Sequence, residues 1–308
     1  MKIVFMGTPA FAVPSLSTLH ESRHQIVAVV TQPDRAAGRG LKLRASPVKL
    51  AAEQLGLPVL QPESLAAPDF VQRLQGLDAD LFAVVAFRIL PESIFTIPPK
   101  GTVNLHASLL PKYRGAAPIN WAIINGETRT GVTTILIRKE VDAGDILLQR
   151  ETEIGEDETA GELHDRLAQL GAEVLLETVE GLDAGTLTPK RQEGEVTRAP
   201  KLTRELAEIR WHQSSVEIRN LVRGLNPVPA AFTYFHGKVL KVFEARLADP
   251  ASDAEPGEII EVSRHSFKVA TGSGALEVTQ LQLEGKRKMS VEEFLRGQKV
   301  HVGQKLGR

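Results

Sequence analysis

Apolar residues in the first half of the chain form short runs typical of buried strands, and these runs alternate with amphipathic segments. The pattern predicts strands at residues 2–6, 25–31, 58–60 and 81–86 and helices at 14–20, 47–55 and 69–74. Because strands and helices alternate, we expect a mostly parallel sheet with helices on both faces. Such sheets bind their ligands beyond the carboxyl ends of the strands.

The second half of the chain changes its pattern near residue 210. A long amphipathic helix is predicted at 159–182, where Thr159 and Glu162 fit a capping box, and a polar stretch rich in cations follows at 186–210. A second capped helix at 214–225 precedes five short strands at 231–235, 238–245, 257–262, 266–270 and 275–281. Short strands with glycine turns favour a small barrel of the OB type.

This order predicts an α/β protein in which a Rossmann-type, mostly parallel sheet domain precedes a smaller OB-like β-barrel domain. The expected boundaries are 1–188 for the first domain, 189–210 for a basic linker and 211–308 for the barrel. The length of 308 residues suits two domains.

Composition narrows the classes of function. The absence of cysteine excludes disulfides, thiolate nucleophiles and cysteine metal sites, and a net charge of -1 argues against indiscriminate binding of nucleic acid. No run of 18 apolar residues and no leader pattern is found, so we expect a cytoplasmic protein without a membrane partner. His20 and His24 are four residues apart, but their helix ends there, and we expect no metal site.

The stretch from Gly101 to Asp145 carries the candidate chemistry. Asn104 and His106 are two residues apart on a predicted strand, so their side chains share one side of it. A loop at 107–115, a helix at 117–125 and a strand at 131–137 follow, and Asp142 lies on the next loop. These three polar residues could converge at one sheet edge, although an isolated Asn-x-His pair is more often structural.

Residues 32–46 are predicted to form a long loop in which four cations accompany a single acidic residue, Asp34. A solvated surface loop is the ordinary interpretation of such a stretch. Glycines on both sides of Arg39 would give a mobile arm, which suits a phosphate backbone. The cations are Arg35, Arg39, Lys42 and Arg44.

The run N-L-H-A-S-L-L-P-K-Y-R-G-A-A-P at 104–118, followed by D-A-G-D at 142–145, resembles the signature of folate-dependent formyltransferases. Further landmarks extend the resemblance over nearly the whole chain. It implies a Rossmann-type domain joined to an OB-like domain, and formyl transfer from 10-formyltetrahydrofolate to an amino group. By this resemblance Asn104, His106 and Asp142 are catalytic, and folate is bound by Ser108, Leu109, Leu110 and Pro111.

The basic stretch resembles the acceptor-stem-binding loop of those family members that formylate initiator methionyl-tRNA for translation initiation. The resemblance therefore implies contacts to tRNA from Arg35, Arg39, Lys42 and Arg44, and we expect the protein to act as a monomer. Within the family, the sugar-nucleotide enzymes share the central signature but lack the basic arm. A tRNA-binding protein with a degenerate site would keep the arm without needing the three polar residues.

The chemistry of formyl transfer agrees with this assignment. The carbonyl oxygen becomes negative during transfer, so hydrogen-bond donors such as the Asn104 amide and a protonated His106 are needed beside it. The attacking amine loses a proton and the departing folate nitrogen gains one, and Asp142 can broker both steps. No metal is required. The chain departs from the family at Phe87-Arg88-Ile89-Leu90-Pro91, a loop that is one residue shorter than usual and lacks a glycine.

Overall fold

The computed structural model describes residues 1–37, 42–249 and 254–307. Within them the chain forms two compact units. The first contains 1–118, 129–153 and 164–199, and the second contains 119–128, 154–163 and 200–308. Each unit is therefore built from segments that are separated in the sequence.

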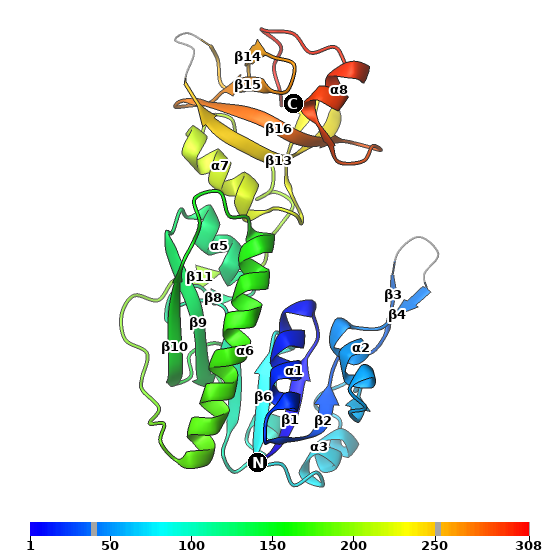
Figure 1. The fold of residues 1–308 in the computed structure, drawn as a ribbon, viewed down its shortest axis with the longest axis vertical. Coiled ribbons are helices and arrows are strands. Elements are labelled where there is room, and N and C mark those ends of the chain that lie inside the picture. Colours follow the sequence, from blue (N-terminus) through cyan, green and yellow to red (C-terminus); the bar gives the residue numbers. More distant parts are fainter. Residues whose placement is uncertain (38–41, 250–253, 308) are drawn as a thin grey trace. The chain divides into compact units, whose positions relative to one another are not determined.

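The first unit is organised around a seven-stranded sheet with the order β10-β9-β7-β6-β1-β2-β5 (Figure 1). Five neighbouring strands run parallel, namely β7 (Thr102–His106), β6 (Leu81–Val85), β1 (Lys2–Gly7), β2 (Gln25–Val30) and β5 (Val59–Leu60). Two antiparallel strands, β9 (Arg129–Leu136) and β10 (Ile146–Glu153), complete one edge. The predicted fold class, a mostly parallel sheet domain followed by an antiparallel β domain, is confirmed.

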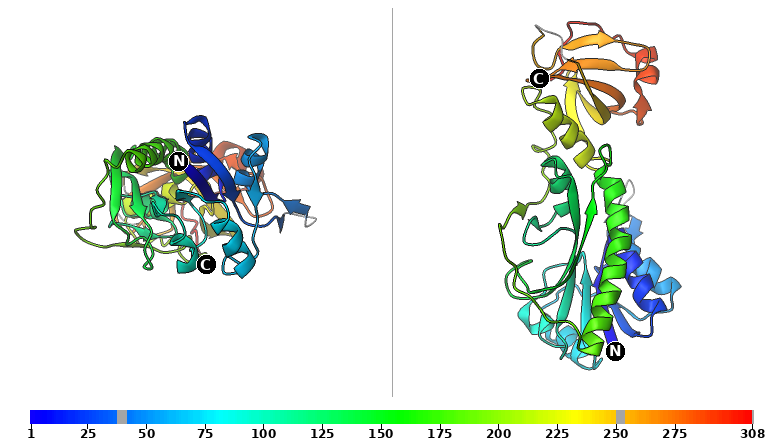
Figure 2. Two further views of the ribbon diagram at one scale, coloured as in Figure 1. Left: turned by 90° about the horizontal axis from the view of Figure 1, so that it is seen from below. Right: turned by 60° about the vertical axis from the view of Figure 1, so that its left-hand side comes forward.

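Helices cover both faces of this sheet. On one face, Val4 and Met6 of β1 join a core with Phe70, Leu74 and Ile94, which belong to α3 (Pro68–Gln75) and α4 (Glu92–Phe95). The helix α6 (Ala160–Ala184) lies along the sheet in both views of Figure 2. The remaining helical segments of this unit are η1 (Ala10–Ala12), α1 (Val13–Glu21) and α2 (Pro47–Gln54).

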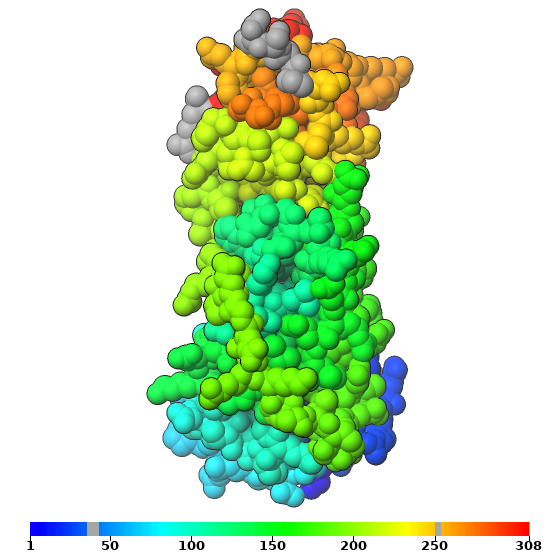
Figure 3. Space-filling model, turned by 90° about the vertical axis from the view of Figure 1, so that its left-hand side faces the viewer, coloured from blue at the N-terminus to red at the C-terminus, as the bar shows by residue number. Residues whose placement is uncertain are grey.

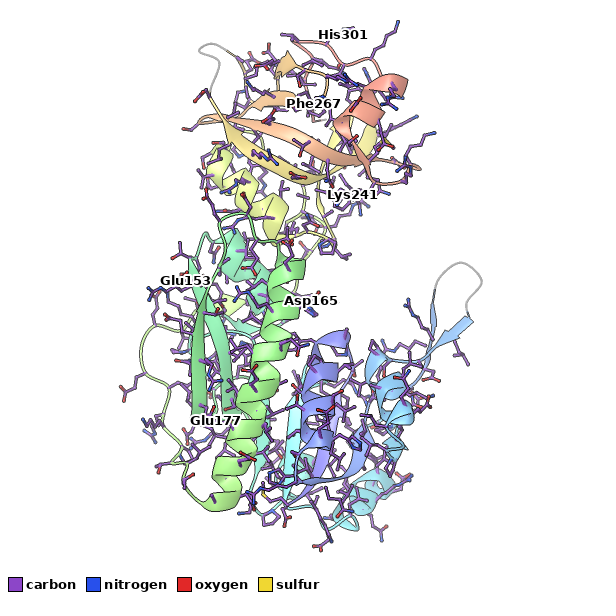
Figure 4. The ribbon with its side chains drawn as sticks, in the orientation of Figure 1. Glu153, Asp165, Glu177, Lys241, Phe267 and His301 are labelled. Carbon is purple, nitrogen blue, oxygen red and sulfur yellow. The ribbon has the colours of Figure 1, made fainter. Side chains whose placement is uncertain are left out.

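The face that α6 covers is identified by two contacts. A Cβ on Gly171 would lie 2.7 Å from Leu105 of β7, and the Thr178 and Thr134 hydroxyls are 2.8 Å apart. Because side chains alternate along a strand, Asn104 and His106 lie on the opposite face of β7. Acidic side chains of the helix such as Glu177, labelled in Figure 4, are exposed and pair with cations such as Arg150.

The second unit contains an antiparallel sheet with the strand order β12-β13-β16-β15-β14, and β17 pairs with β16. Phe267, labelled in Figure 4, is 1% exposed and lies in the core that these strands share with α7 and α8. The bounds are Ala231–Phe235 for β12, Lys238–Ala248 for β13, Ile259–Val262 for β14, Phe267–Ala270 for β15, Ala275–Leu283 for β16, Met289–Ser290 for β17, Pro118–Ile124 for α5, Ser215–Gly224 for α7 and Val291–Gly297 for α8.

Two small two-stranded sheets lie outside these layers. A hairpin is formed by β3 (Arg35–Ala37) and β4 (Lys42–Arg44), and β8 (Arg114–Gly115) pairs in parallel with β11 (Arg198–Ala199). The prediction of a long loop at 32–46 is therefore wrong, because the chain folds back on itself and satisfies its backbone groups across the hairpin. The predicted mobile tip around Arg39 lies outside the described residues.

The described residues contain neither a candidate membrane-spanning helix nor a candidate metal cluster. None of the helices there is long and apolar enough to cross a membrane. No group of three metal-ligating side chains gathers in that part of the chain either, and His24 instead contacts the N-terminal amine of Met1.

Candidate active site

The strand β7 presents Asn104 and His106 on the face opposite α6. Asn104 pairs in register with Val84 of β6 and Ile135 of β9, which fixes its height in the sheet. The residue is partly exposed, and its amide makes no hydrogen bond to any other described side chain or backbone group. A partly exposed amide without such a bond, on a backbone fixed in the sheet, is available to a ligand.

Hydrogen bonding fixes the orientation of the His106 ring. Its Nε2 lies 2.9 Å from the carbonyl oxygen of Tyr113, and a carbonyl can only accept. Nε2 therefore carries a proton and donates it, which leaves Nδ1 as the ring nitrogen that faces the site. The side chain of His106 is only 7% exposed.

Asp142 lies on the loop between β9 and β10, where its backbone φ is +53°. Its Oδ2 accepts a hydrogen bond from the backbone N–H of Gly115 at 2.9 Å and lies 3.7 Å from His106 Nδ1. This second distance is too long for a direct hydrogen bond, so the two groups are close neighbours without a direct bond. The structure thus brings together the histidine and the carboxylate that the sequence singles out, although the chain separates them by 36 positions.

Two glycines allow the backbones around Asp142 to approach one another. A Cβ on Gly144 would lie 1.8 Å from the carbonyl oxygen of Leu136 in β9. Gly115 has a φ of +130°, and a Cβ there would lie 2.5 Å from the carbonyl oxygen of Ala199. Neither position accepts a side chain without a backbone shift, so both loops are held close to their neighbours.

The loop that follows β7 is held by a buried polar network. The hydroxyl of Thr133 donates to the Ser108 carbonyl at 2.6 Å and accepts from the backbone N–H of Leu110 at 3.2 Å. Gln149 donates to the same hydroxyl and to the Leu110 carbonyl, at 2.9 and 3.0 Å. Neither Thr133 nor Gln149 was predicted, because nothing local to their strands marks them as partners of this loop.

The predicted folate-binding residues differ in exposure. Ser108 and Leu110 are buried, and the Ser108 hydroxyl donates within the loop to the Lys112 carbonyl at 2.6 Å. Leu109 and Pro111 are partly exposed. Any ligand contact from this loop therefore falls to Leu109, Pro111 and the backbone, while the other two side chains support the loop from below.

A segment at 190–199, here called the strap, crosses the surface of the first unit, where Figure 3 shows it as a yellow-green band over green and teal. Its Thr197 accepts from the backbone N–H groups of Tyr113 and Arg114, through its hydroxyl and its carbonyl respectively. Its Gln192 contacts the loop that carries Asp142. The strap belongs to the first part of the predicted linker, and its packing was missed because the pairing partners are remote in sequence.

Two of the predicted tRNA-binding cations lie directly opposite each other. Arg35 and Arg44 are cross-strand neighbours in the β3–β4 hairpin, both are exposed, and neither pairs with a carboxylate among the described residues. Like charges at directly opposite positions destabilise a hairpin. The backbone of Lys42 pairs with Ala37 in the same hairpin, while Arg39 is outside the described residues.

The base of this hairpin is fastened by a polar cluster around Asp34. Lys49 Nζ donates to Asp34 Oδ2 at 2.6 Å, and Gln61 donates to Asp34 Oδ1 at 2.8 Å. The hydrogen bonds from Lys49 and Gln61 hold the pKa of the Asp34 carboxyl below its ordinary value. Asp34 is therefore bonded to Lys49 and Gln61 and does not neutralise the exposed arginines Arg35 and Arg44.

The shortened loop after β6 is anchored by its arginine. Arg88 donates to the backbone carbonyls of Pro62 and Glu63, at 3.0 and 3.2 Å, and its guanidinium lies 5.3 Å from the centroid of the Phe87 ring. Burial lowers the pKa of Arg88. Ile89 is 76% exposed, so the loop carries an exposed apolar residue next to the anchored Arg88.

Comparisons with known proteins identify the family of the chain. Residues 1–179 match the model of the formyl transferase family and residues 201–299 match the formyl transferase C-terminal domain. The chain therefore belongs to the formyltransferase family and is an enzyme of formyl transfer.

Its similarity within the family is specific and covers the full chain. It is 50% identical over 306 residues to methionyl-tRNA formyltransferase of Caldanaerobacter subterraneus, covering 98% of this chain and 99% of that protein. It is 48% identical to methionyl-tRNA formyltransferase of Citrifermentans bemidjiense, covering 100% of this chain and 97% of the relative.

A solved structure shares the fold at low sequence identity. This is HypX of Aquifex aeolicus in complex with tetrahydrofolic acid, at a TM-score of 0.66 and 20% identity, covering 99% of this chain and 50% of HypX. The match shows that the two proteins share a fold, and this chain covers half the length of HypX.

Proposed function

We propose that this protein transfers a formyl group from 10-formyltetrahydrofolate to the amino group of methionine on initiator methionyl-tRNA. The observation that carries the proposal is the arrangement of a free Asn104 amide, an oriented His106 and the Asp142 carboxylate at one edge of the sheet. The family uses folate derivatives, and relatives of nearly the same length are named methionyl-tRNA formyltransferases. An enzyme with this substrate works where translation starts, so we place it in the cytoplasm.

Asn104 and His106 stabilise the charge that develops on the formyl oxygen. The Asn104 amide N–H is free to donate, and preorganised donors of this kind lower the transition-state energy because they need no reorganisation. His106 already donates Nε2–H to Tyr113, so only Nδ1 can face the substrate. In the protonated form of His106, Nδ1–H is a second donor, and it lies 3.7 Å from Asp142 Oδ2.

Asp142 handles the proton of the reaction. A bond forms between the methionine amino nitrogen and the formyl carbon, and the bond from that carbon to the folate nitrogen breaks. The amine loses a proton and the folate nitrogen gains one, and the Asp142 carboxylate accepts the first and supplies the second, directly or through water. The Gly115 N–H holds one of its oxygens and leaves the other for this role.

Contacts to folate and tRNA complete the assignment. Leu109, Pro111 and the backbone of the 108–111 loop are placed to contact folate beside β7. The hairpin offers Arg35 and Arg44, whose mutual repulsion is relieved when a phosphate group lies between them. We also assign Lys42 and Arg39 to tRNA on sequence grounds. The strap at 190–199 packs on the first unit, so we assign it to the catalytic segment together with 1–188, and we keep 211–308 as the barrel segment.

Substrate competition tests the proposal. Purified protein would be given 10-formyltetrahydrofolate and either charged initiator tRNA or a nucleotide-linked amino sugar, and kcat/KM would be compared for the two acceptors. We expect transfer to the tRNA-linked methionine to exceed transfer to the amino sugar by at least about 1,000-fold, because the tRNA contacts contribute binding energy to the transition state. Comparable values for both acceptors would refute the tRNA assignment.

A further inference from the structure

The side chain of Gln192 joins three parts of the first unit. Its Nε2 donates to the backbone carbonyls of Asp142 and Gly144, at 2.7 and 2.8 Å. Its Oε1 accepts from Arg114 Nε and Nη2, at 3.1 and 2.6 Å. One amide on the strap therefore contacts the loop after β9 and the loop after β7 together.

The partners determine which way the amide points. Two carbonyl oxygens accept hydrogen bonds only, and a guanidinium donates only, so the NH2 group must face the Asp142 loop and the oxygen must face Arg114. The amide therefore donates two hydrogen bonds and accepts two, which uses all of its hydrogen-bonding capacity. No other side chain of similar size supplies two donors on one side and an acceptor on the other, apart from a shorter asparagine.

Asp142 needs support of this kind because its backbone is in the left-handed region, at a φ of +53°. That conformation is unfavourable for a residue with a side chain and persists only when its surroundings hold it. The bond from Gln192 reaches the carbonyl of Asp142 itself, while the bond from Gly115 N–H reaches its carboxylate. Gly115 follows Arg114 directly, so the Gln192 amide is bonded both to the Asp142 loop and to the segment whose N–H contacts the Asp142 carboxylate.

We propose that Gln192 is a positioning residue for the transfer reaction, which sets the place of the Asp142 carboxylate beside His106 by bridging the two loops. It acts through Asp142 and needs no contact with substrate. The proposal rests on the proposed function only in assigning Asp142 to the chemistry.

Gln192→Glu removes the two hydrogen bonds that Gln192 donates to the Asp142 loop and keeps the oxygen that accepts from Arg114. The glutamate retains the size and an acceptor for Arg114 but loses both donors and sets a negative oxygen against two carbonyls. We expect single-turnover formyl transfer to fall by about tenfold or more, since small displacements of a reacting group are costly. The KM values for folate and tRNA should stay within about twofold, because Gln192 contacts neither.

Gln282→Glu is the matched control. Gln282 lies on β16 in the second unit and donates to the Lys286 carbonyl at 2.7 Å, so the same substitution removes the same kind of bond elsewhere. It should leave the transfer rate and both KM values unchanged.

Amide hydrogen exchange of the full chain distinguishes positioning from general loosening of the strap. The Gly115 N–H is bonded to Asp142 Oδ2, whereas the Arg114 and Ala116 N–H groups are bonded to Thr197 and Ala199 of the strap. In Gln192→Glu the Gly115 amide should exchange about tenfold faster while its two neighbours keep the parent rates.

The outcomes separate the possible failures. Faster exchange at Gly115 alone, together with slower transfer, supports the proposal. Unchanged exchange at Gly115, or equal acceleration at all three amides, overturns it whatever the substrate proves to be. If the parent protein does not formylate charged tRNA, the proposed function fails, and the exchange result still decides whether Gln192 positions Asp142.

Discussion

The most direct structural perturbation of the site is Gly144→Ala, which adds one methyl group beside the Asp142 loop. The new Cβ would lie 1.8 Å from the Leu136 carbonyl oxygen. Carbon and oxygen atoms in close contact are normally at least about 3.3 Å apart, so the loop must shift by about 1.5 Å. The loop is fastened to β9 nearby, where Leu136 N–H donates to the Asp145 carbonyl at 3.0 Å.

This shift displaces the carboxylate two residues earlier in the chain. A misplacement of about 1 Å in a reacting group costs about 100-fold in rate, so we expect the single-turnover rate of formyl transfer to fall by about that factor. Overpacking of this kind also lowers the free energy of unfolding by about 1–3 kcal/mol. Rapid-quench transfer assays and thermal unfolding would measure both effects.

Gly297→Ala is the control, because a Cβ on Gly297 would meet nothing within 4 Å and its φ is not in the left-handed region. It should leave the rate unchanged and should not lower the free energy of unfolding, because alanine is compatible with this helical position. A Gly144→Ala protein that is folded and transfers formyl at the parent rate would show that the close approach of this loop to β9 does not control the position of Asp142.

Two further predictions concern the hairpin and the N-terminus. Arg35→Ala and Arg44→Ala should each weaken tRNA binding and reduce the slope of log affinity against log salt by about 1, with folate affinity unchanged. An unaltered slope for both variants would show that the hairpin is an ordinary solvated surface that does not bind tRNA. Burial, and next the Met1 ammonium, lower the pKa of His24 from 6.5. In the pH range in which the unfolded chain protonates His24, the folded protein therefore keeps the ring neutral. Thermal stability should fall as pH decreases below about 6.5, and His24→Asn should weaken that dependence. Equal pH profiles of stability for the variant and the parent would contradict this reasoning.

Local patterns were sufficient to predict the parallel strands and the capped helices. Both predicted capping boxes are present, at Thr159 with Glu162 and at Ser214 with Glu217. Each depends on residues three apart, so the sequence itself contains the interaction. The β12 strand was likewise predicted at its observed bounds, because its apolar residues end at a glycine turn.

Elements whose partners are remote were predicted poorly. The strand β10 was missed because it is an edge strand whose exposed, charged positions obscure its alternation, and β17 and the strands of the β3–β4 hairpin are only two or three residues long. The sequence predicts linker where the strap lies, because β11 pairs with β8 across more than 80 positions of sequence. Hydrogen bonds over such separations leave no periodic signal in either segment.

The sequence was sufficient to predict the candidate catalytic residues but not the residues that hold them in position. The signature around Asn104 and His106 and the carboxylate at 142 were visible as residue types at fixed spacing. The dependence of Asp142 on Gln192 was not visible, since a glutamine in a polar segment has no distinguishing neighbour. The orientation of the His106 ring could not be predicted either, because it depends on the position of the Tyr113 carbonyl.

The single-turnover rate of formyl transfer from 10-formyltetrahydrofolate to charged initiator tRNA, in the parent and in Asn104→Ala, His106→Ala and Asp142→Asn, tests the central claim most directly. We predict that each substitution lowers this rate by about 100-fold or more while tRNA affinity and thermal stability stay near parent values, because the three groups act on the transition state. Near-parent rates in all three correctly folded variants would contradict the assignment of this site.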